Sequence, residues 1–233
     1  MSALPWILGG GAVALTAYAL TRRDREDAHH DAGPLPGRWV WPMGVWLGRK
    51  PEISDGFTGT RRAPSGEALR HGGVDVMYRR VASDHYPASG PNGSRNFVMP
   101  DHRAALAASG GVVWSASYTP RGWTVVIDHK PHKLATYYTH MSQLLVVPKQ
   151  TVAAGQPIGI VGADPLDAAH LKHLHYELWR GGAADRIDPE PLMRSWEYLP
   201  DPGDLPAALV ARNARASADL VHVRPHTRSY PRR

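Results

Sequence analysis

The chain has 233 residues and a formal net charge of +6, from 27 lysines and arginines against 21 aspartates and glutamates. This length allows one sizeable hydrophobic core with extensions, because typical domains have about 100–150 residues. The chain has no cysteine, which excludes disulfides and thiolate-bound metal, so any metal must take histidine and carboxylate ligands. The basic balance suits an anionic polymer, either a bacterial cell wall or a nucleic acid, but solubility alone explains it equally well.

Residues 1–21 are predicted to form a hydrophobic helix that serves as a transmembrane or signal-anchor segment. Residues 4–20 are uncharged and mostly apolar, and a charged run begins at Arg22. Their number is near the lower edge of the roughly 17–25 residues that span a bilayer. A cleaved signal peptide is the alternative, since residues 17–19 (AYA) have cleavage-site character, but no Lys or Arg precedes the apolar run.

Two further segments are predicted to lie outside the folded domain. Residues 22–37 are polar, charged and rich in Pro and Gly, which is typical of a flexible linker, so His29 and His30 are interpreted as solvated. Residues 199–233 have Tyr230 as their single aromatic residue and end in arginines, which predicts an extended basic tail. Aromatic residues are not interleaved with these arginines, which argues against nucleic-acid binding.

The residues between them, 38–198, are predicted to form one mainly β domain. Helical periodicity is scarce, whereas several runs rich in β-branched or aromatic residues are bounded by Gly or Pro. The predicted strands are 111–118, 123–128, 133–140, 156–161 and 174–179. Residues 78–98 break this pattern with turn-forming residues and are interpreted as an insertion beside the candidate site described next. We therefore expect antiparallel sheets joined by long loops.

Histidines and a carboxylate recur in a pattern that suits a metal. His173 and His175 alternate along a predicted strand, so both imidazoles point to the same face. His71 and Asp75 are separated by small residues, a spacing that a short strand or tight loop can fold around one cation. His140 stands at the end of an apolar, aromatic run. Zinc suits this set of donors best.

The chemistry of such a metal assigns roles to these residues only in part. A catalytic zinc keeps three protein ligands and one position for water, whose pKa it lowers to about 7. His71, Asp75 and one of the histidines at 173 and 175 fit the ligand role. The other one, with His140, would accept the proton of the water or stabilise the developing oxyanion. Spacing alone does not choose between His173 and His175.

Three motifs closely resemble, in order and spacing, those of the lysostaphin/LytM-type zinc metalloendopeptidases, which cut peptidoglycan cross-links. They are HGGVD at 71–75, YTH at 138–140 and HLHYE at 173–177. Three intervening or flanking segments also match, namely ISDGF at 53–57, GGVV at 110–113 and VAAGQPIGIVG at 152–162. The resemblance covers roughly residues 71–179.

This resemblance implies a fold and a role for each site residue. The expected fold is a lysostaphin/LytM-like peptidase domain, an antiparallel β-sheet with long loops whose groove holds one Zn²⁺ per chain. His71, Asp75 and His175 are implied as the metal ligands. His140 and His173 are implied as the catalytic pair that flanks the bound water and the scissile carbonyl.

The remaining histidines of the domain are interpreted as ordinary core or surface hydrogen-bonding residues. They are His85, His102, His129, His132 and His170. Residues 169–172 (AHLK) replace the glycine-rich approach that is usual in the family before its HxH motif, a departure that bears on loop shape and substrate preference. Glu177 lies on the face of the strand that carries the histidines and is interpreted as a residue that orients an imidazole.

The sequence thus predicts a zinc-dependent endopeptidase that hydrolyses peptide cross-links of bacterial peptidoglycan. The alternative is a non-catalytic peptidoglycan-binding or regulatory module on the same fold. Such modules are recognised by the loss of zinc ligands, whereas this sequence retains all of them. The expected partners are the peptidoglycan peptide, a membrane through the N-terminal segment, and a phage or envelope complex.

The expected location is a membrane at the bacterial envelope or in a virion. Arg22, Arg23 and Arg25 would keep the catalytic part cytoplasmic by the positive-inside rule, and the acidic residues among them do little to offset this. A wall hydrolase should face the other side. The conflict disappears if the membrane or particle belongs to a phage.

Overall fold

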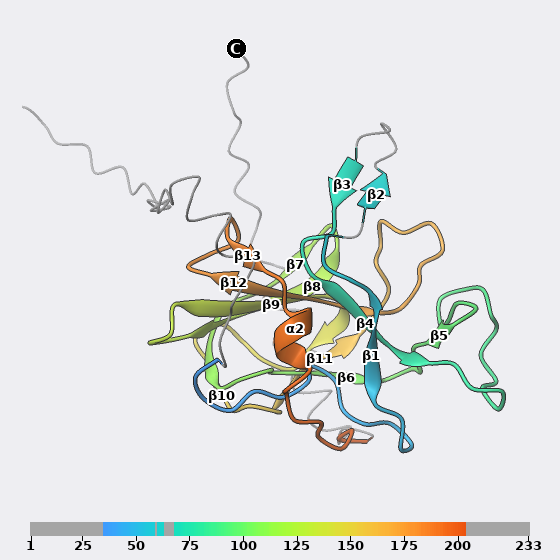
Figure 1. The fold of residues 1–233 in the computed structure, drawn as a ribbon, viewed down its shortest axis with the longest axis horizontal. Coiled ribbons are helices and arrows are strands. Elements are labelled where there is room, and N and C mark those ends of the chain that lie inside the picture. Colours follow the sequence, from blue (N-terminus) through green and yellow to red (C-terminus); the bar gives the residue numbers. More distant parts are fainter. Residues whose placement is uncertain (1–34, 59, 63–67, 204–233) are drawn as a thin grey trace, which may run out of the picture. The chain divides into compact units, whose positions relative to one another are not determined.

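The computed structural model describes residues 35–58, 60–62 and 68–203 (Figure 1). The predicted N-terminal helix, most of the predicted linker and residues 204–233 of the predicted tail lie outside these residues. Within the described part, no helix is long and apolar enough to cross a membrane.

The described chain is built almost entirely from strands (Figure 1). The strands are β1 (Pro51–Asp55), β2 (Thr60–Arg62), β3 (Ala68–Arg70), β4 (Val74–Arg79), β5 (Phe97–Val98), β6 (Ala104–Leu106), β7 (Gly111–Thr119), β8 (Gly122–His129), β9 (Leu134–Leu144), β10 (Thr151–Val152), β11 (Pro157–Val161), β12 (Leu174–Arg180) and β13 (Arg186–Ile187). The helix α2 (Glu190–Met193) follows them.

One sheet contains all of these strands except β2 and β3, which pair with each other. The order along its main path is β1-β4-β12-β9-β8-β7-β10, and every strand pair is antiparallel. The predicted mainly β, antiparallel fold is therefore confirmed. The five predicted strands correspond to β7, β8, β9, β11 and β12. Their bounds differ from the prediction mainly in β9, which continues past residue 140 to Leu144 and pairs there with β11.

The predicted insertion is a loop whose two ends belong to the sheet. Tyr78 pairs with Val98 across β4 and β5, so the irregular part is shorter than predicted. Arg80 organises this loop from inside by donating to the carbonyl oxygens of Ser94 at 2.8 Å and Tyr86 at 2.7 Å. Hydrogen bonds of this kind replace the missing strand ladder and give the loop one conformation.

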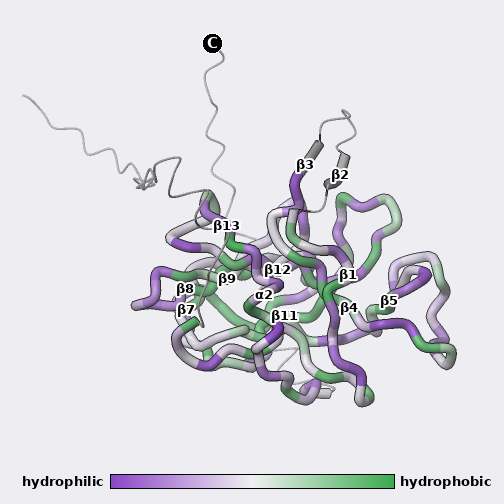
Figure 2. Tube along the Cα trace, viewed as in Figure 1, coloured by the Kyte–Doolittle hydropathy of each residue, from purple (hydrophilic) through white to green (hydrophobic). Residues whose placement is uncertain are grey.

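The sheet formed by the central strands has one face that packs on the hydrophobic core and an opposite face that carries the candidate site. On β12, Leu174, Tyr176 and Leu178 enter the hydrophobic core, while the alternate residues point to the opposite face. Tyr176 meets Tyr138 of β9 edge-on, with ring centroids 5.3 Å apart. Figure 2 shows hydrophobic residues concentrated in these central strands and hydrophilic ones in the outer loops.

The two ends of the described domain lie side by side over the core. Trp41 donates its backbone N–H to Glu197 at 2.9 Å, and Val45 donates to Leu199 at 2.7 Å. Trp39 stacks on Trp196 at 5.0 Å between ring centroids. Residues from both ends therefore complete the core, and the segment up to residue 201 is part of the fold.

Candidate metal centre

Strand register brings the three sequence motifs to one place. His175 on β12 pairs directly with Asp75 on β4, and on its other side with Thr139 on β9. His71 precedes β4, and His140 follows Thr139. Since paired residues share a face of the sheet, motifs that are far apart in the chain become neighbours.

The glycine at position 73 permits this approach. A Cβ at Gly73 would collide with the carbonyl oxygen of Tyr176 on β12. A side chain there would push β4 away from β12 and with it Asp75 away from His175. This close contact explains why small residues separate His71 from Asp75.

His71, Asp75 and His175 form a compact triangle of possible ligand atoms, and all three residues are buried. His71 Nε2 lies 2.9 Å from His175 Nδ1 and 3.1 Å from Asp75 Oδ1, and His175 Nδ1 lies 2.9 Å from Asp75 Oδ1. Zinc bonds of roughly 2.0–2.2 Å in tetrahedral geometry separate neighbouring ligand atoms by about 3.3–3.6 Å. The sides of the triangle are slightly shorter than that, so a bound ion would spread the three atoms by a few tenths of an ångström.

The outer nitrogens of both histidines set their tautomers. His71 Nδ1 donates to the carbonyl oxygen of Gly56 at 2.8 Å, and His175 Nε2 donates to Glu177 Oε1 at 3.0 Å. When a cation takes the place of the proton between His175 and Asp75, both histidines adopt the neutral tautomers in which His71 Nε2 and His175 Nδ1 present lone pairs toward the same point as the Asp75 carboxylate. Three acceptor atoms then converge on one point. A bound cation satisfies all three at once, so the residues fit a zinc ion.

Charge interactions keep the acidic members ionised. Burial acts to raise the pKa of Asp75, but hydrogen bonds with His175 and His71 outweigh it and hold the pKa well below its ordinary value. Burial likewise opposes ionisation of Glu177, yet hydrogen bonds from His175, Arg186 and Trp179 hold its pKa below the ordinary value. Both carboxylates are therefore anionic at neutral pH.

Glu177 contacts His175 in the orienting position that the sequence predicted. Its second oxygen, Oε2, accepts from Trp179 Nε1 at 2.6 Å and from Arg186 Nε at 2.7 Å. The carboxylate is thus fixed on both sides and holds the imidazole of His175 in one orientation. Contacts of this kind tune a metal ligand without touching the metal.

His140 and His173 lie together next to this triangle, with ring centroids 4.6 Å apart. His140 Nδ1 donates to the carbonyl oxygen of Arg121 at 3.0 Å, and His173 Nδ1 donates to that of Leu171 at 2.9 Å. Both rings therefore turn Nε2 toward the site. His173 Nε2 is buried, lies 3.6 Å from Asp75 Oδ2 and has no hydrogen-bond partner among the described residues. Such an orphaned atom indicates a group that binds there.

His140 is placed by a local break in β9. Its φ of +63° lies in the left-handed region, which a non-glycine residue adopts only at a cost of roughly 1–2 kcal/mol. The pairing of β8 with β9 shifts register at this point, between the pairs Trp123–Met141 and Val125–Tyr138. Gly162 donates its N–H to the His140 carbonyl oxygen at 2.6 Å. The bulge re-aims the His140 side chain toward the site face.

His140 is neutral at physiological pH. Burial lowers its pKa to about 2, and the neighbouring His173 and His175 act in the same direction. A neutral imidazole with a lone pair on Nε2 is able to accept a proton.

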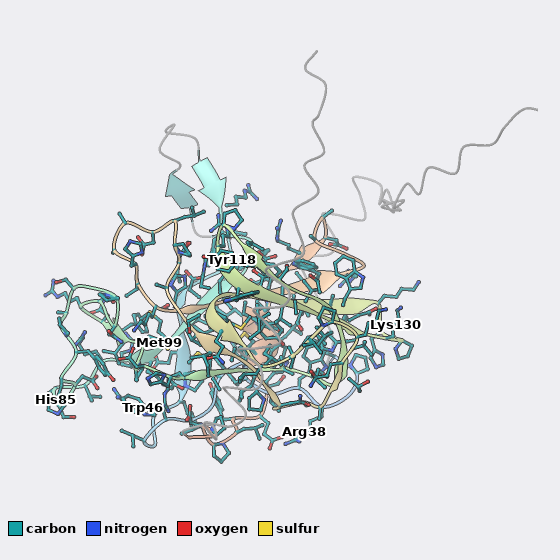
Figure 3. All side chains as sticks on the ribbon, turned by 180° about the vertical axis from the view of Figure 1, so that it is seen from behind. Arg38, Trp46, His85, Met99, Tyr118 and Lys130 are labelled. Atoms are coloured by element: carbon teal, nitrogen blue, oxygen red, sulfur yellow. The ribbon has the colours of Figure 1, made fainter. Side chains whose placement is uncertain are left out.

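The other histidines stay outside this cluster, as predicted. His85, His102, His132 and His170 are exposed, and His85 lies at the outer part of the insertion (Figure 3). His129 is buried, donates from Nδ1 to the Gly110 carbonyl oxygen and accepts at Nε2 from Thr136, each at 2.8 Å. It is a core residue that joins β8 to its neighbours.

Two residues beside the site were not identified from the sequence. Asp164 Oδ2 lies 3.6 Å from His140 Nε2 and 3.5 Å from Arg121 Nη1. Arg121 stands in the turn between β7 and β8, and the pairing of β8 with β9, which the sequence does not give, brings it beside His140. Asp164 lies in the loop that departs from the family pattern, and no local pattern marked it.

A comparison with protein families matches residues 91–189 to peptidase family M23. This range includes His140, His173 and His175, but it begins after His71 and Asp75. No curated protein matches the whole sequence significantly.

Solved structures share the fold at low sequence identity. Lysostaphin from Staphylococcus simulans is 20% identical, with a TM-score of 0.50 over 70% of this chain and 61% of that one. The SpoIIQ–SpoIIIAH pore-forming complex gives 18% and 0.50, over 67% of this chain and 91% of that one. A zinc-containing peptidase from Vibrio cholerae gives 24% and 0.48, over 70% of this chain and only 41% of that one. Residues 91–189 thus match peptidase family M23, and the described domain shares the fold of lysostaphin.

Proposed function

We propose that the protein is a zinc-dependent endopeptidase that hydrolyses peptide cross-links of bacterial peptidoglycan. The observation that carries the proposal is the convergence of three acceptor atoms, from His71, Asp75 and His175, next to the orphaned Nε2 of His173. A structural metal site would need no such pair of histidines facing it. The match of residues 91–189 to peptidase family M23 supports the same reaction class.

The residues divide into holders of the metal and groups that act on the substrate. His71, Asp75 and His175 would hold the ion, and Glu177 would keep His175 in position. When bound, zinc polarises a peptide carbonyl and makes water more acidic. His140 and His173, through their Nε2 atoms, would take up the proton of the attacking water and stabilise the oxyanion that develops on the scissile carbonyl.

We further propose that residues 1–21 attach the protein to a membrane at the bacterial envelope or in a virion. These residues lie outside the described part of the chain, so the proposal rests on their apolar sequence. A tethered hydrolase would act only on wall that lies within reach of its linker.

The direct test combines metal analysis with digestion of peptidoglycan. The full chain, purified in detergent, should contain close to one zinc ion and should convert the cross-linked peptide dimers of isolated sacculi into monomers, as read by mass spectrometry after the glycan strands have been digested with a muramidase. A chelator should stop the conversion and added zinc should restore it. A folded protein that binds sacculi and never cleaves them would instead support the non-catalytic module.

A further inference from the structure

Two arginines flank the candidate metal centre in matching ways. Arg186 contacts Glu177 through Nε at 2.7 Å, and Arg121 contacts Asp164 through Nη1 at 3.5 Å. Both carboxylates are buried, with side chains 8% and 9% exposed, whereas the arginine side chains are 43% and 50% exposed. Each guanidinium is thus held at one end by the protein and faces solvent at the other.

Each arginine belongs to one half of the site. Glu177 links Arg186 to His175 in the ligand triangle, and Arg186 also lies against Gly72, where an added Cβ would be 2.8 Å from its side chain. On the other half, Asp164 Oδ2 lies 3.6 Å from His140 Nε2, and the backbone of Arg121 accepts from the same imidazole. The two cations therefore border the two sides of the centre.

In both arginines, some N–H donors of the guanidinium make no hydrogen bond to the described residues. Arg186 engages Glu177 through Nε, and among the described residues its two terminal nitrogens have no hydrogen-bond partner. Arg121 reaches Asp164 only at 3.5 Å, longer than the roughly 2.7–2.9 Å of a strong guanidinium–carboxylate bond. A guanidinium carries five N–H donors in a planar fork that matches a carboxylate. Donors remain for an anion from outside.

We infer that Arg121 and Arg186 bind free carboxylates of the substrate on the two sides of the cleaved bond, so that the site selects acidic peptides. This inference rests on the proposed function, because it names the class of cross-link that the peptidase accepts. If the arginines served only to neutralise Asp164 and Glu177, a substrate carboxylate would make no difference to the rate.

The test uses two synthetic versions of the cross-linked peptide dimer that the protein cleaves in sacculi. One version keeps its free carboxylates, and the other carries carboxamides in their place. The zinc-loaded full chain should cleave the carboxylate form with a kcat/KM about 10-fold higher or more, as expected for charge-assisted hydrogen bonds. The measured quantity is the ratio of kcat/KM for the carboxylate dimer to kcat/KM for the carboxamide dimer.

The variants separate recognition from structure. Arg121→Gln and Arg186→Gln should each reduce the ratio several-fold, and Arg186→Lys should retain part of it because the charge remains. Arg38→Gln is the matched control, since Arg38 makes an exposed ion pair with Glu197 at 3.0 Å and lies far from Tyr118, which precedes the turn that holds Arg121 (Figure 3). Zinc content is measured in every variant.

The outcomes are distinct. Equal rates for the two dimers in the wild-type protein overturn the inference and leave the peptidase intact. Loss of activity by the same factor on both dimers in the glutamine variants means a structural role and also overturns it. Cleavage of neither dimer or of sacculi by the wild-type protein overturns the proposed function, and the inference with it.

Discussion

At the scale of single residues, the site separates atoms that would hold a metal from atoms that would move a proton. His175 lies in the ligand triangle because its Nδ1 faces Asp75 Oδ1 at 2.9 Å, whereas His173 Nε2 stays 3.6 Å from Asp75 Oδ2 and its ring packs against His140. The two histidines share a strand face, yet their outer hydrogen bonds give them different inner atoms. The difference is testable because metal content and turnover are separate measurements.

Replacing His71, Asp75 or His175 by Ala should abolish zinc retention, because two ligands form an incomplete shell. His140→Ala and His173→Ala should keep the metal and lose at least about 10²-fold in kcat, the usual contribution of a general acid or base. Zinc analysis beside a peptidoglycan digestion assay reads both effects. The exposed His132→Ala is the control and should change neither. If His173→Ala lost zinc and His175→Ala retained it, His173 would be the metal ligand and His175 the catalytic residue, contrary to the proposed assignment.

At the scale of elements, the bulge in β9 positions His140. It does so through a positive φ at residue 140, a backbone conformation that is unfavourable for any residue with a Cβ. The positive φ is a property of the strand pairing around residue 140, with Gly162 bonded to its carbonyl oxygen. The cost is local and should appear in stability measurements rather than in zinc content.

Glycine at position 140 should therefore be more stable than alanine there, by about 1 kcal/mol, because glycine adopts positive φ without a Cβ clash. At position 173 the order should reverse, with His173→Ala at least as stable as His173→Gly. Urea unfolding of the four metal-free variants measures both differences. A more stable alanine at position 140 would mean that the bulge is not strained.

The contact of β8 with the turn before β7 predicts a pH dependence. Burial lowers the pKa of His129, so the folded state resists a proton that the unfolded chain accepts below about pH 6.5. The unfolded state then binds more protons, and the contribution of His129 to folding stability falls as the pH drops from 6.5 toward its folded pKa.

The free energy of unfolding of the wild-type protein should therefore decrease more steeply between pH 6.5 and 5 than that of His129→Gln. Urea unfolding at a series of pH values gives the two curves, with exposed His85→Gln as the matched control that should follow the wild type. Parallel curves for wild type and His129→Gln would show that His129 titrates equally in both states.

At the scale of the whole molecule, the ends of the domain contribute to the fold. Trp41 and Val45 bond to the segment 197–199, and Arg103 pairs with Asp201 at 2.7 Å while both side chains are nearly buried. The predicted boundary at residue 198 therefore cuts through contacts. No sequence pattern indicated them, because Tyr230 is the single aromatic residue after that point.

Removal of residues 204–233 should leave a folded domain with unchanged cleavage of cross-links in isolated sacculi, as should removal of residues 1–34. Removal of residues 197–233 should unfold it, because it breaks these backbone bonds and leaves Arg103 buried without its partner, typically a loss of 3–5 kcal/mol. Circular dichroism melting and the digestion assay distinguish the cases. A stable, active chain that ends at residue 196 would contradict the role of this segment.

The sequence by itself predicted the antiparallel β class, five strands and the residues that meet at the centre. It did so because strand alternation and motif spacing are local: residues two apart share a face, whatever lies across from them. The tertiary structure decided which nitrogen of each histidine faces inward, the positive φ of His140, and the positions of Asp164, Arg121 and Arg186. These depend on register between strands that are distant in the chain and on side chains that no local pattern links.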